Sequence, residues 1–153
     1  MKTMRRKDRE TPRLEAEAIL AAGAYGVLST VGEDGQPYGV PVSYTYKNNC
    51  IYFHCAAVGH KIENIQNNPR VSFCVVGNTR VMPAERTVKY ESAIVFGVAS
   101  EVQGSEKDDA LLALLEKYSA EYIEEGKTVI SEKGKTTTVI KIEINHISGK
   151  AQR

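Results

Sequence analysis

The stretch IYFHCAAVGHKIENIQNNPRVSFCVV, residues 51–76, decides the fold of this chain. It begins and ends with apolar runs typical of buried strands, and between them lie a glycine turn, a short amphipathic helix over 60–67 and an Asn-Pro stop. This order puts Lys61 at the start of a helix, shortly after Gly59. Backbone N–H groups and an ammonium group that converge in this way suit a phosphate. The stretch therefore predicts a site for a phosphate-bearing cofactor.

Hairpin signals dominate the sequence before this stretch. Residues 25–31 and 38–46 are typical of strands, and the turn between them contains Asp34-Gly35. Together with a strand over 51–54, they predict a three-stranded meander. Pro41 removes one ladder hydrogen bond from the middle strand, so it marks a sheet edge, a bulge or a place where the backbone serves a ligand.

The rest of the chain predicts further antiparallel strands and two more helices. Gly97 interrupts a long apolar strand, which is typical of a bulge, a barrel corner or a close backbone approach. A stripe of leucines predicts an amphipathic helix that begins near Ser105 in a capping-box-like pattern. A further helix is expected over 12–22, with Thr11 as its cap and Gly23 at its end. Further strands are expected over 71–76, 90–103 and 136–147. A loop is expected over 77–87 and a turn over 126–135. About six short strands and three helices predict an antiparallel barrel with helices packed outside it.

Composition narrows the class of protein. A chain of 153 residues is expected to form a single domain, residues 1–153, with a core that needs no disulfides. The formal net charge of +1 gives no general footprint for nucleic acid or an anionic membrane. No apolar run is long enough to span a membrane, the first residues lack a signal-peptide core, and the three cysteines show no C-x-x-C spacing. These features predict a cytoplasmic protein.

Known catalytic motifs give little guidance. The common nucleotide-binding, hydrolase and zinc-protease motifs are absent, and the adjacent His54 and Cys55 point to opposite faces of a strand, so they cannot share a metal. Taken singly, His54 is typical of a hydrogen-bonded core or rim residue, and Lys61 of a solvated helix residue. Considered with Gly59 and His60, they gather a titratable ring, a flexible backbone and a cation in one turn. The phosphate-site interpretation and the structural one are evenly matched on this evidence.

A resemblance to a known family adds to this picture. The segments MRRKDRE, YGVLST, YGVPVSY, IYFHCAAVGHKIENIQNNPRVSF, YESAIVFGVASEV and HISGKA, in this order and spacing, resemble the flavin-binding split-barrel proteins related to pyridoxamine 5′-phosphate oxidase. Within them, the chain is most similar to the nitroimidazole-resistance (Nim-type) subgroup. The resemblance covers essentially the whole chain. It implies a mainly β fold with flanking helices, namely a six-stranded antiparallel split β-barrel of the FMN-binding type. It also implies a homodimer with FMN, or alternatively FAD, in grooves at the subunit interface.

The resemblance also implies which residues bind the flavin. The residues expected along the isoalloxazine ring are Val40, Pro41, Val42, Ser43 and Tyr44, and those expected beside the ring and ribityl chain are Phe53, His54, Cys55 and Ala56. The residues expected at the phosphate are Gly59, His60 and Lys61. Ser92 is expected to reach the flavin from the second subunit. The oxidase branch carries a Ser-Arg-Lys run where this chain has Gly59-His60-Lys61. That departure leaves one certain cation instead of two.

The implied activity is that of a flavin-dependent reductase. The Nim-type reaction is the reduction of a nitroimidazole with electrons from a reduced donor, and His54 is the candidate proton donor or substrate anchor. Three alternatives stay open: a flavin-binding protein without turnover, a barrel that binds haem or a deazaflavin, and an enzyme like pyridoxamine 5′-phosphate oxidase. The last is disfavoured because the basic residues that its phosphorylated substrate requires cannot be placed in this sequence.

Overall fold

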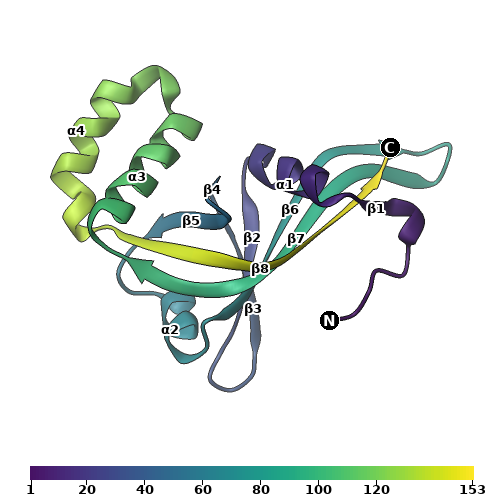
Figure 1. Ribbon diagram of the computed structural model, residues 1–153, viewed down its shortest axis with the longest axis horizontal. Coiled ribbons are helices and arrows are strands. Elements are labelled where there is room, and N and C mark those ends of the chain that lie inside the picture. The colour runs from purple at the N-terminus through teal and green to yellow at the C-terminus, as the bar shows by residue number, and fades with distance from the viewer.

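One antiparallel sheet runs through the computed structural model, which describes residues 1–153 (Figure 1). The strands follow the spatial order β3-β2-β6-β7-β8-β5-β4, and β1 pairs with β8. The strands are β1 (Glu10–Thr11), β2 (Gly26–Val31), β3 (Pro37–Val42), β4 (Thr45–Lys47), β5 (Cys50–Cys55), β6 (Arg70–Met82), β7 (Thr87–Val102) and β8 (Thr138–Gln152). The helices are α1 (Arg13–Ala22), α2 (His60–Asn67), α3 (Gly104–Tyr118) and α4 (Ile123–Lys133), with short 3-10 turns η1 (Lys7–Arg9), η2 (Ala120–Tyr122) and η3 (Gly134–Thr136). None of the helices is long and apolar enough to cross a membrane.

The end strands β3 and β4 lie at opposite edges of the sheet and do not pair with each other. The predicted mainly β, antiparallel split barrel is therefore confirmed, with an 8-stranded sheet in place of six strands. The predicted hairpin around Asp34-Gly35 is confirmed as β2 and β3, but the strand expected over 38–46 is broken after Val42, and the three-stranded meander is wrong because β3 does not pair with β5. The chain leaves the sheet after Val42, crosses at Ser43 and Tyr44, and re-enters it on the other edge. Pro41 lies on β3, which pairs only with β2, so the edge interpretation of this proline is confirmed.

The crossing is fixed by Tyr44, whose side chain is 0% exposed. Its ring packs edge-on against Phe73 with centroids 4.9 Å apart, and its hydroxyl donates a hydrogen bond to the Leu20 carbonyl. Leu20 lies in the last turn of α1, where helix carbonyls lack a helical partner. Burial also raises the pKa of the Tyr44 phenol, which keeps it a donor.

Replacing Tyr44 with phenylalanine should therefore destabilise the fold. The substitution leaves the Leu20 carbonyl buried without a donor, so we expect the free energy of unfolding to fall by about 1–3 kcal/mol. Unfolding in urea measures the change. Tyr25→Phe is the matched control, because the Tyr25 side chain is 60% exposed, and its stability should equal that of the wild type. Equal stability of Tyr44→Phe and the control would contradict this role of the hydroxyl.

The β6–β7 hairpin is longer than the sequence predicts. The expected loop over 77–87 is wrong, because β6 continues to Met82 and β7 starts at Thr87. The register of the β6–β7 pairing shifts between Gly77 and Arg80, where Asn78 has a φ of 49°. Beyond this irregularity the two strands pair again. The hairpin extends at the end of the molecule opposite α3 and α4 (Figure 1).

Gly97 occupies a bulge in β7, which is one of the three interpretations of this interior glycine. The pairing of β7 with β8 shifts between Phe96 and Gly97. A β-carbon at Gly97 would collide with the backbone carbonyl of Glu143, which cannot move aside. The close backbone approach explains the glycine, and the bulge bends the longest strand of the sheet.

Two helices start one residue away from the predicted position, without the predicted caps, and a fourth helix was not predicted. α1 begins at Arg13, with Pro12 as its cap and Thr11 paired to Gly149 in the sheet, although it ends before Gly23 as expected. α3 begins at Gly104, so Ser105 lies inside the helix and caps nothing. The expected turn over 126–135 is largely the helix α4.

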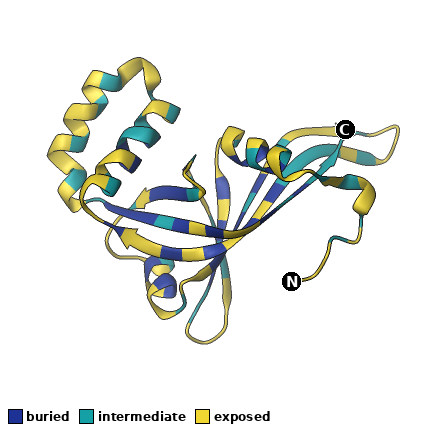
Figure 2. Ribbon diagram, in the orientation of Figure 1, coloured by how far each residue is buried: buried dark blue, intermediate teal, exposed yellow.

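Two hydrophobic clusters hold these elements together. The larger cluster joins α1 and α2 to the inner face of the sheet. The smaller one lies under α3 and consists of Tyr52, Val102, Ala110, Leu111 and Val139. α4 contributes no buried residue and is exposed along most of its length (Figure 2). The α3–α4 pair is therefore attached to the sheet mainly through α3.

Candidate functional site

A groove opens where β3, β5 and the segment just before β8 meet the first turn of α2. Its volume is about 530 Å³. It is lined by Pro41, Val42, Ser43, His54, Cys55, Ala56, Lys61, Thr136 and Thr137. We call it the Lys61 groove. Its first seven lining residues are among the predicted site residues, and the two threonines are not.

Strand geometry decides which predicted residues face this groove. On β5, Phe53 is 0% exposed and points into the core, whereas its neighbour His54 is exposed and points into the groove. Val40 packs against the main core, and Tyr44 is part of it. The side chains of Val40, Tyr44 and Phe53 therefore support the groove from behind and do not line it.

Lys61 is the only cation that lines the groove. Its side chain is half-buried, and none of the ion pairs in the structure involves it. Burial raises the pKa of the neighbouring Cys55 thiol, and the positive charge of Lys61 partly opposes this rise. The ammonium group is thus free to bind an anion in the groove.

The start of α2 adds backbone donors beside Lys61. Gly59 is the N-terminal cap residue and has a φ of 149°, in the region that favours glycine. It has no side chain, so the first N–H groups of the helix have no side-chain acceptor at the cap. These N–H groups and the Lys61 ammonium form an arrangement that suits a phosphate.

The side chains of two further predicted residues point or lie away from the groove. The His60 ring stacks on Tyr38 with centroids 3.9 Å apart, beside the acidic Glu33 and Asp34 of the β2–β3 turn. The structure therefore does not bring the His60 ring to Lys61. Ser92 lies on β7 opposite Val76 and Lys150, on the far hairpin, and within one chain it cannot reach the groove.

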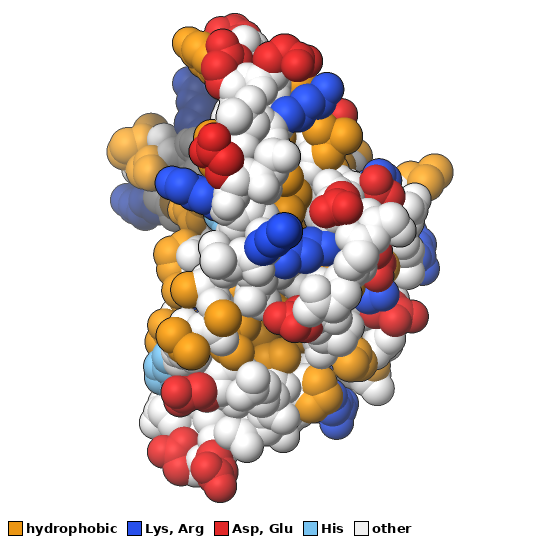
Figure 3. Space-filling view, turned by 90° about the vertical axis from the view of Figure 1, so that its left-hand side faces the viewer, with side chains coloured by type: hydrophobic (Ala, Val, Ile, Leu, Met, Phe, Trp, Pro, Cys, Tyr) orange, Lys and Arg blue, Asp and Glu red, His pale blue; other side chains and the backbone are white.

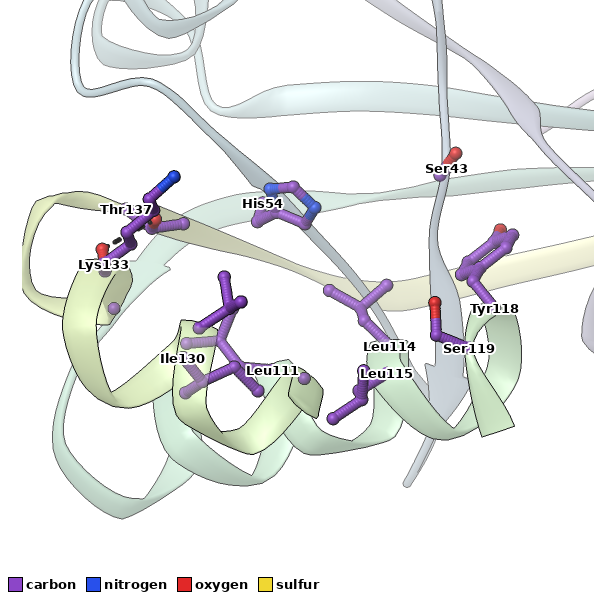
Figure 4. Close-up of a pocket in the computed structure, with 13 residues that line it drawn as sticks. Ser43, His54, Leu111, Leu114, Leu115, Tyr118, Ser119, Ile130, Lys133 and Thr137 are labelled. Atoms are coloured by element: carbon purple, nitrogen blue, oxygen red, sulfur yellow. Dashed lines mark hydrogen bonds between the residues drawn. The ribbon is translucent and has the colours of Figure 1, made fainter. Parts of the chain in front are cut away.

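A second, apolar cavity adjoins the groove beneath α3 and α4. Its volume is about 540 Å³, and it shares Ser43, His54 and Thr137 with the groove (Figure 4). Its other lining residues are Leu111, Leu114, Leu115, Tyr118, Ser119, Gly126, Val129, Ile130, Lys133 and Gly134. We call it the α3–α4 cavity. The prediction missed it because residues 126–135 were expected to form a turn, although Val129 and Ile130 together with the α3 leucines were a signal for two packed helices.

The C-terminal end of α3 holds the crossing segment in place. The Tyr118 hydroxyl donates to the Ala24 carbonyl oxygen at 2.7 Å and accepts from the Tyr44 N–H at 3.0 Å. The Lys117 ammonium donates to the Tyr44 carbonyl at 2.8 Å and lies 3.8 Å from the centre of the Tyr44 ring. These contacts fix the backbone next to Ser43, which lines both the groove and the cavity.

Stability should depend on pH through Lys117. Burial lowers the pKa of its ammonium group to about 8, whereas a lysine in an unfolded chain has a pKa of about 10.4. Between these values the unfolded chain keeps a proton that the folded protein has released, so the free energy of unfolding should rise with pH. The difference in stability between the wild type and Lys117→Met, measured in urea at several pH values, should show this rise. A difference that does not change over this range would contradict the shifted pKa.

The face of the molecule that carries α3 and α4 mixes apolar and charged side chains. Figure 3 shows hydrophobic side chains gathered in the lower half of this face and basic and acidic ones around them. This distribution leaves apolar surface uncovered on this face. The formal net charge is only +1, and Lys61 gives the groove a local positive charge.

Comparisons with known proteins identify the family. A protein of Rhizobium meliloti without an assigned function is 38% identical over 61 residues, which are 39% of this chain and 38% of that protein. An FAD-binding protein of Mesorhizobium loti is 27% identical, with a TM-score of 0.70 over 95% of this chain and 97% of that one. A candidate 5-nitroimidazole antibiotic resistance protein of Bacteroides thetaiotaomicron is 21% identical, with a TM-score of 0.74 over 92% of this chain and 84% of that one.

The match to the family covers nearly the whole chain. The sequence matches the pattern of the pyridoxamine 5′-phosphate oxidase family over residues 12–151. These residues include every element from α1 to nearly the end of β8, and with them the Lys61 groove and the α3–α4 cavity. Because the match covers nearly the whole chain, the chain belongs to the pyridoxamine 5′-phosphate oxidase family.

Proposed function

We propose that this protein binds FMN in the Lys61 groove and acts as a flavin-dependent reductase of small nitroaromatic compounds. One observation carries the proposal: an unpaired, half-buried ammonium group lies at the start of a helix, in the same groove as Ser43 and His54. The family membership and the FAD-binding relative of Mesorhizobium loti support a flavin. The Bacteroides relative supports a nitroaromatic substrate.

The groove fits the polar parts of a flavin nucleotide. Lys61 and the first N–H groups of α2 would hold the phosphate. The hydroxyl groups of Ser43, Thr136 and Thr137 offer hydrogen bonds for the ribityl chain and the polar edge of the ring. The exposed backbone of β3 at Pro41 faces the groove from an edge strand, so its free polar groups are available to the ring.

A second copy of the chain would complete the site. The outer face of the sheet carries the exposed side chains of Val27, Val76, Ile94, Phe96 and Val98. An exposed apolar sheet face of this kind marks an interaction surface. If a second copy covers it, Ser92 of one chain can approach the groove of the other. Light scattering should then give a mass of about twice the 16.9 kDa of one chain, and a monomer at micromolar concentration would contradict this part of the proposal.

The chemistry divides between the cofactor and the chain. Bound FMN would supply hydride transfer, taking electrons from a reduced nicotinamide donor and passing them to the nitro group. The chain would position the substrate and exclude water. The exposed imidazole of His54, at the boundary of groove and cavity, would donate a proton to a substrate oxygen or anchor it by a hydrogen bond.

A turnover assay tests the proposed activity. With FMN, reduced nicotinamide and a nitroimidazole, we expect loss of the nicotinamide absorbance that depends on all three components and on the protein. His54→Ala should lower kcat by about tenfold or more if the imidazole donates a proton, and it should leave FMN affinity nearly unchanged. If the protein binds FMN but oxidises no nicotinamide with any nitroaromatic compound supplied, the proposed reductase activity is contradicted and only flavin binding stands.

A further inference from the structure

The α3–α4 cavity has the properties of a small-molecule site in its own right. Its volume of about 540 Å³ lies within the range of natural ligand pockets. Leu111, Leu114 and Leu115 from α3 and Val129 and Ile130 from α4 form an apolar wall. In Figure 4 the leucine side chains and that of Ile130 face the space below His54. A flat, apolar molecule would bury its faces against this wall.

The only cation that lines the cavity is the exposed Lys133, which lies at the end opposite Ser43, Tyr118 and Ser119. Figure 4 shows the side chains of Lys133 and Thr137 together at this end, with His54 next to them. The Thr137 hydroxyl donates to the Lys133 carbonyl at 3.1 Å, which fixes the start of β8 against the end of α4. None of the ion pairs in the structure involves Lys133. The cavity therefore offers a free positive charge at one end of an apolar slot, which suits a molecule with one anionic group.

The cavity and the groove share a boundary. Ser43, His54 and Thr137 line both spaces, so a molecule in the cavity would lie against a molecule in the groove. No residue of α4 is fully buried, and Ile130 is its only residue that packs against the smaller cluster, so few core contacts hold the outer wall of the cavity. The cavity is thus an accessible second compartment beside the groove.

We infer that the α3–α4 cavity is the substrate compartment and that it selects flat aromatic molecules with an anionic group, such as a nitroaromatic carboxylate. The role as substrate compartment rests on the proposed reductase function, whereas the binding of an aromatic anion does not. The apolar wall would hold the aromatic ring, and Lys133 would pair with the anionic group. His54 would then lie between the bound ring and the contents of the groove.

Binding of an aromatic anion tests the inference without any reaction. The probe is 8-anilinonaphthalene-1-sulfonate, followed by its fluorescence with the folded, flavin-free protein, and 4-nitrobenzoate is the competitor. Ile130→Trp should fill the cavity and abolish probe binding, whereas Ser131→Trp, an exposed neighbour outside the cavity, should bind the probe like the wild type. Lys133→Gln should weaken 4-nitrobenzoate by about two- to fivefold and leave nitrobenzene unchanged. Lys135→Gln, which removes an exposed lysine nearby, should change neither.

The outcomes separate this inference from the proposed function. Wild-type probe binding by Ile130→Trp would overturn the inference, even if FMN binding and turnover are found. A parallel loss of FMN affinity in Ile130→Trp would also overturn it, because the flavin ring itself would then occupy the cavity. If the pattern of probe binding is as expected but the protein takes up no FMN, the proposed function fails and the binding of aromatic anions stands.

Discussion

Replacing Phe53 with alanine is expected to lower the free energy of unfolding by about 3–5 kcal/mol. The Phe53 side chain is 0% exposed and belongs to the cluster that joins the sheet to α1 and α2. Its removal leaves a cavity directly behind His54, because neighbouring residues of β5 face opposite sides of the strand. The loss is large for a domain whose total stability is on the order of 5–15 kcal/mol.

Urea unfolding measures this effect, and Tyr122→Ala is its control. Tyr122 carries a ring of similar size that is 62% exposed, so its removal should change stability by less than about 0.5 kcal/mol. A Phe53→Ala protein as stable as this control would mean that β5 does not pack as the structure shows. The resemblance placed Phe53 beside the flavin; the structure instead predicts a loss of stability, with FMN affinity affected only as the fold weakens.

Replacing Lys61 with alanine is expected to weaken FMN binding by about 1–3 kcal/mol, or roughly 5- to 150-fold in Kd. The ammonium group has no partner in the protein, so its loss removes a charge-assisted hydrogen bond to the phosphate and disrupts no internal ion pair. Stability should stay near that of the wild type. Quenching of flavin fluorescence gives the affinity.

Two further variants sharpen this prediction. Lys47→Ala removes the same charge from an exposed position on β4 outside the groove, and it should leave FMN affinity unchanged. His60→Ala should have a much smaller effect than Lys61→Ala, because the His60 ring stacks on Tyr38 outside the groove. If His60→Ala and Lys61→Ala lose the same FMN affinity, His60 also contacts the phosphate, as the resemblance implies and the structure does not. If Lys61→Ala loses no FMN affinity, the phosphate binds elsewhere.

The elements predicted best from the sequence are those with local signals at both ends. The helix over 60–67 has the predicted bounds, because a glycine precedes it and Asn68-Pro69 ends it. The bulge at Gly97 follows equally well from an interior glycine in an apolar strand. Successive residues of a strand face opposite sides, so recognising β5 as a strand is enough to predict that Phe53 and His54 point in opposite directions.

The features that the sequence does not reveal depend on contacts between distant segments. Residues 77–82 look like a loop, yet they form a strand because β7 pairs with them across the hairpin. Gly126 suggests a turn, but a β-carbon there would collide with Leu115, so the glycine allows α4 to pack closely on α3. The crossing at Tyr44 depends on a hydrogen bond to Leu20 and on contacts from Lys117 and Tyr118. The α3–α4 cavity follows from these long-range contacts, and local patterns do not encode it.

Titration of the purified protein with FMN tests the central claim most directly. We expect saturable quenching of flavin fluorescence with one FMN bound per chain, and a shift of the flavin absorption bands as the ring leaves water. Inorganic phosphate should compete weakly, because it occupies only the Lys61 end of the groove. A protein that binds neither FMN nor FAD under these conditions would contradict the proposal that the Lys61 groove is a flavin site.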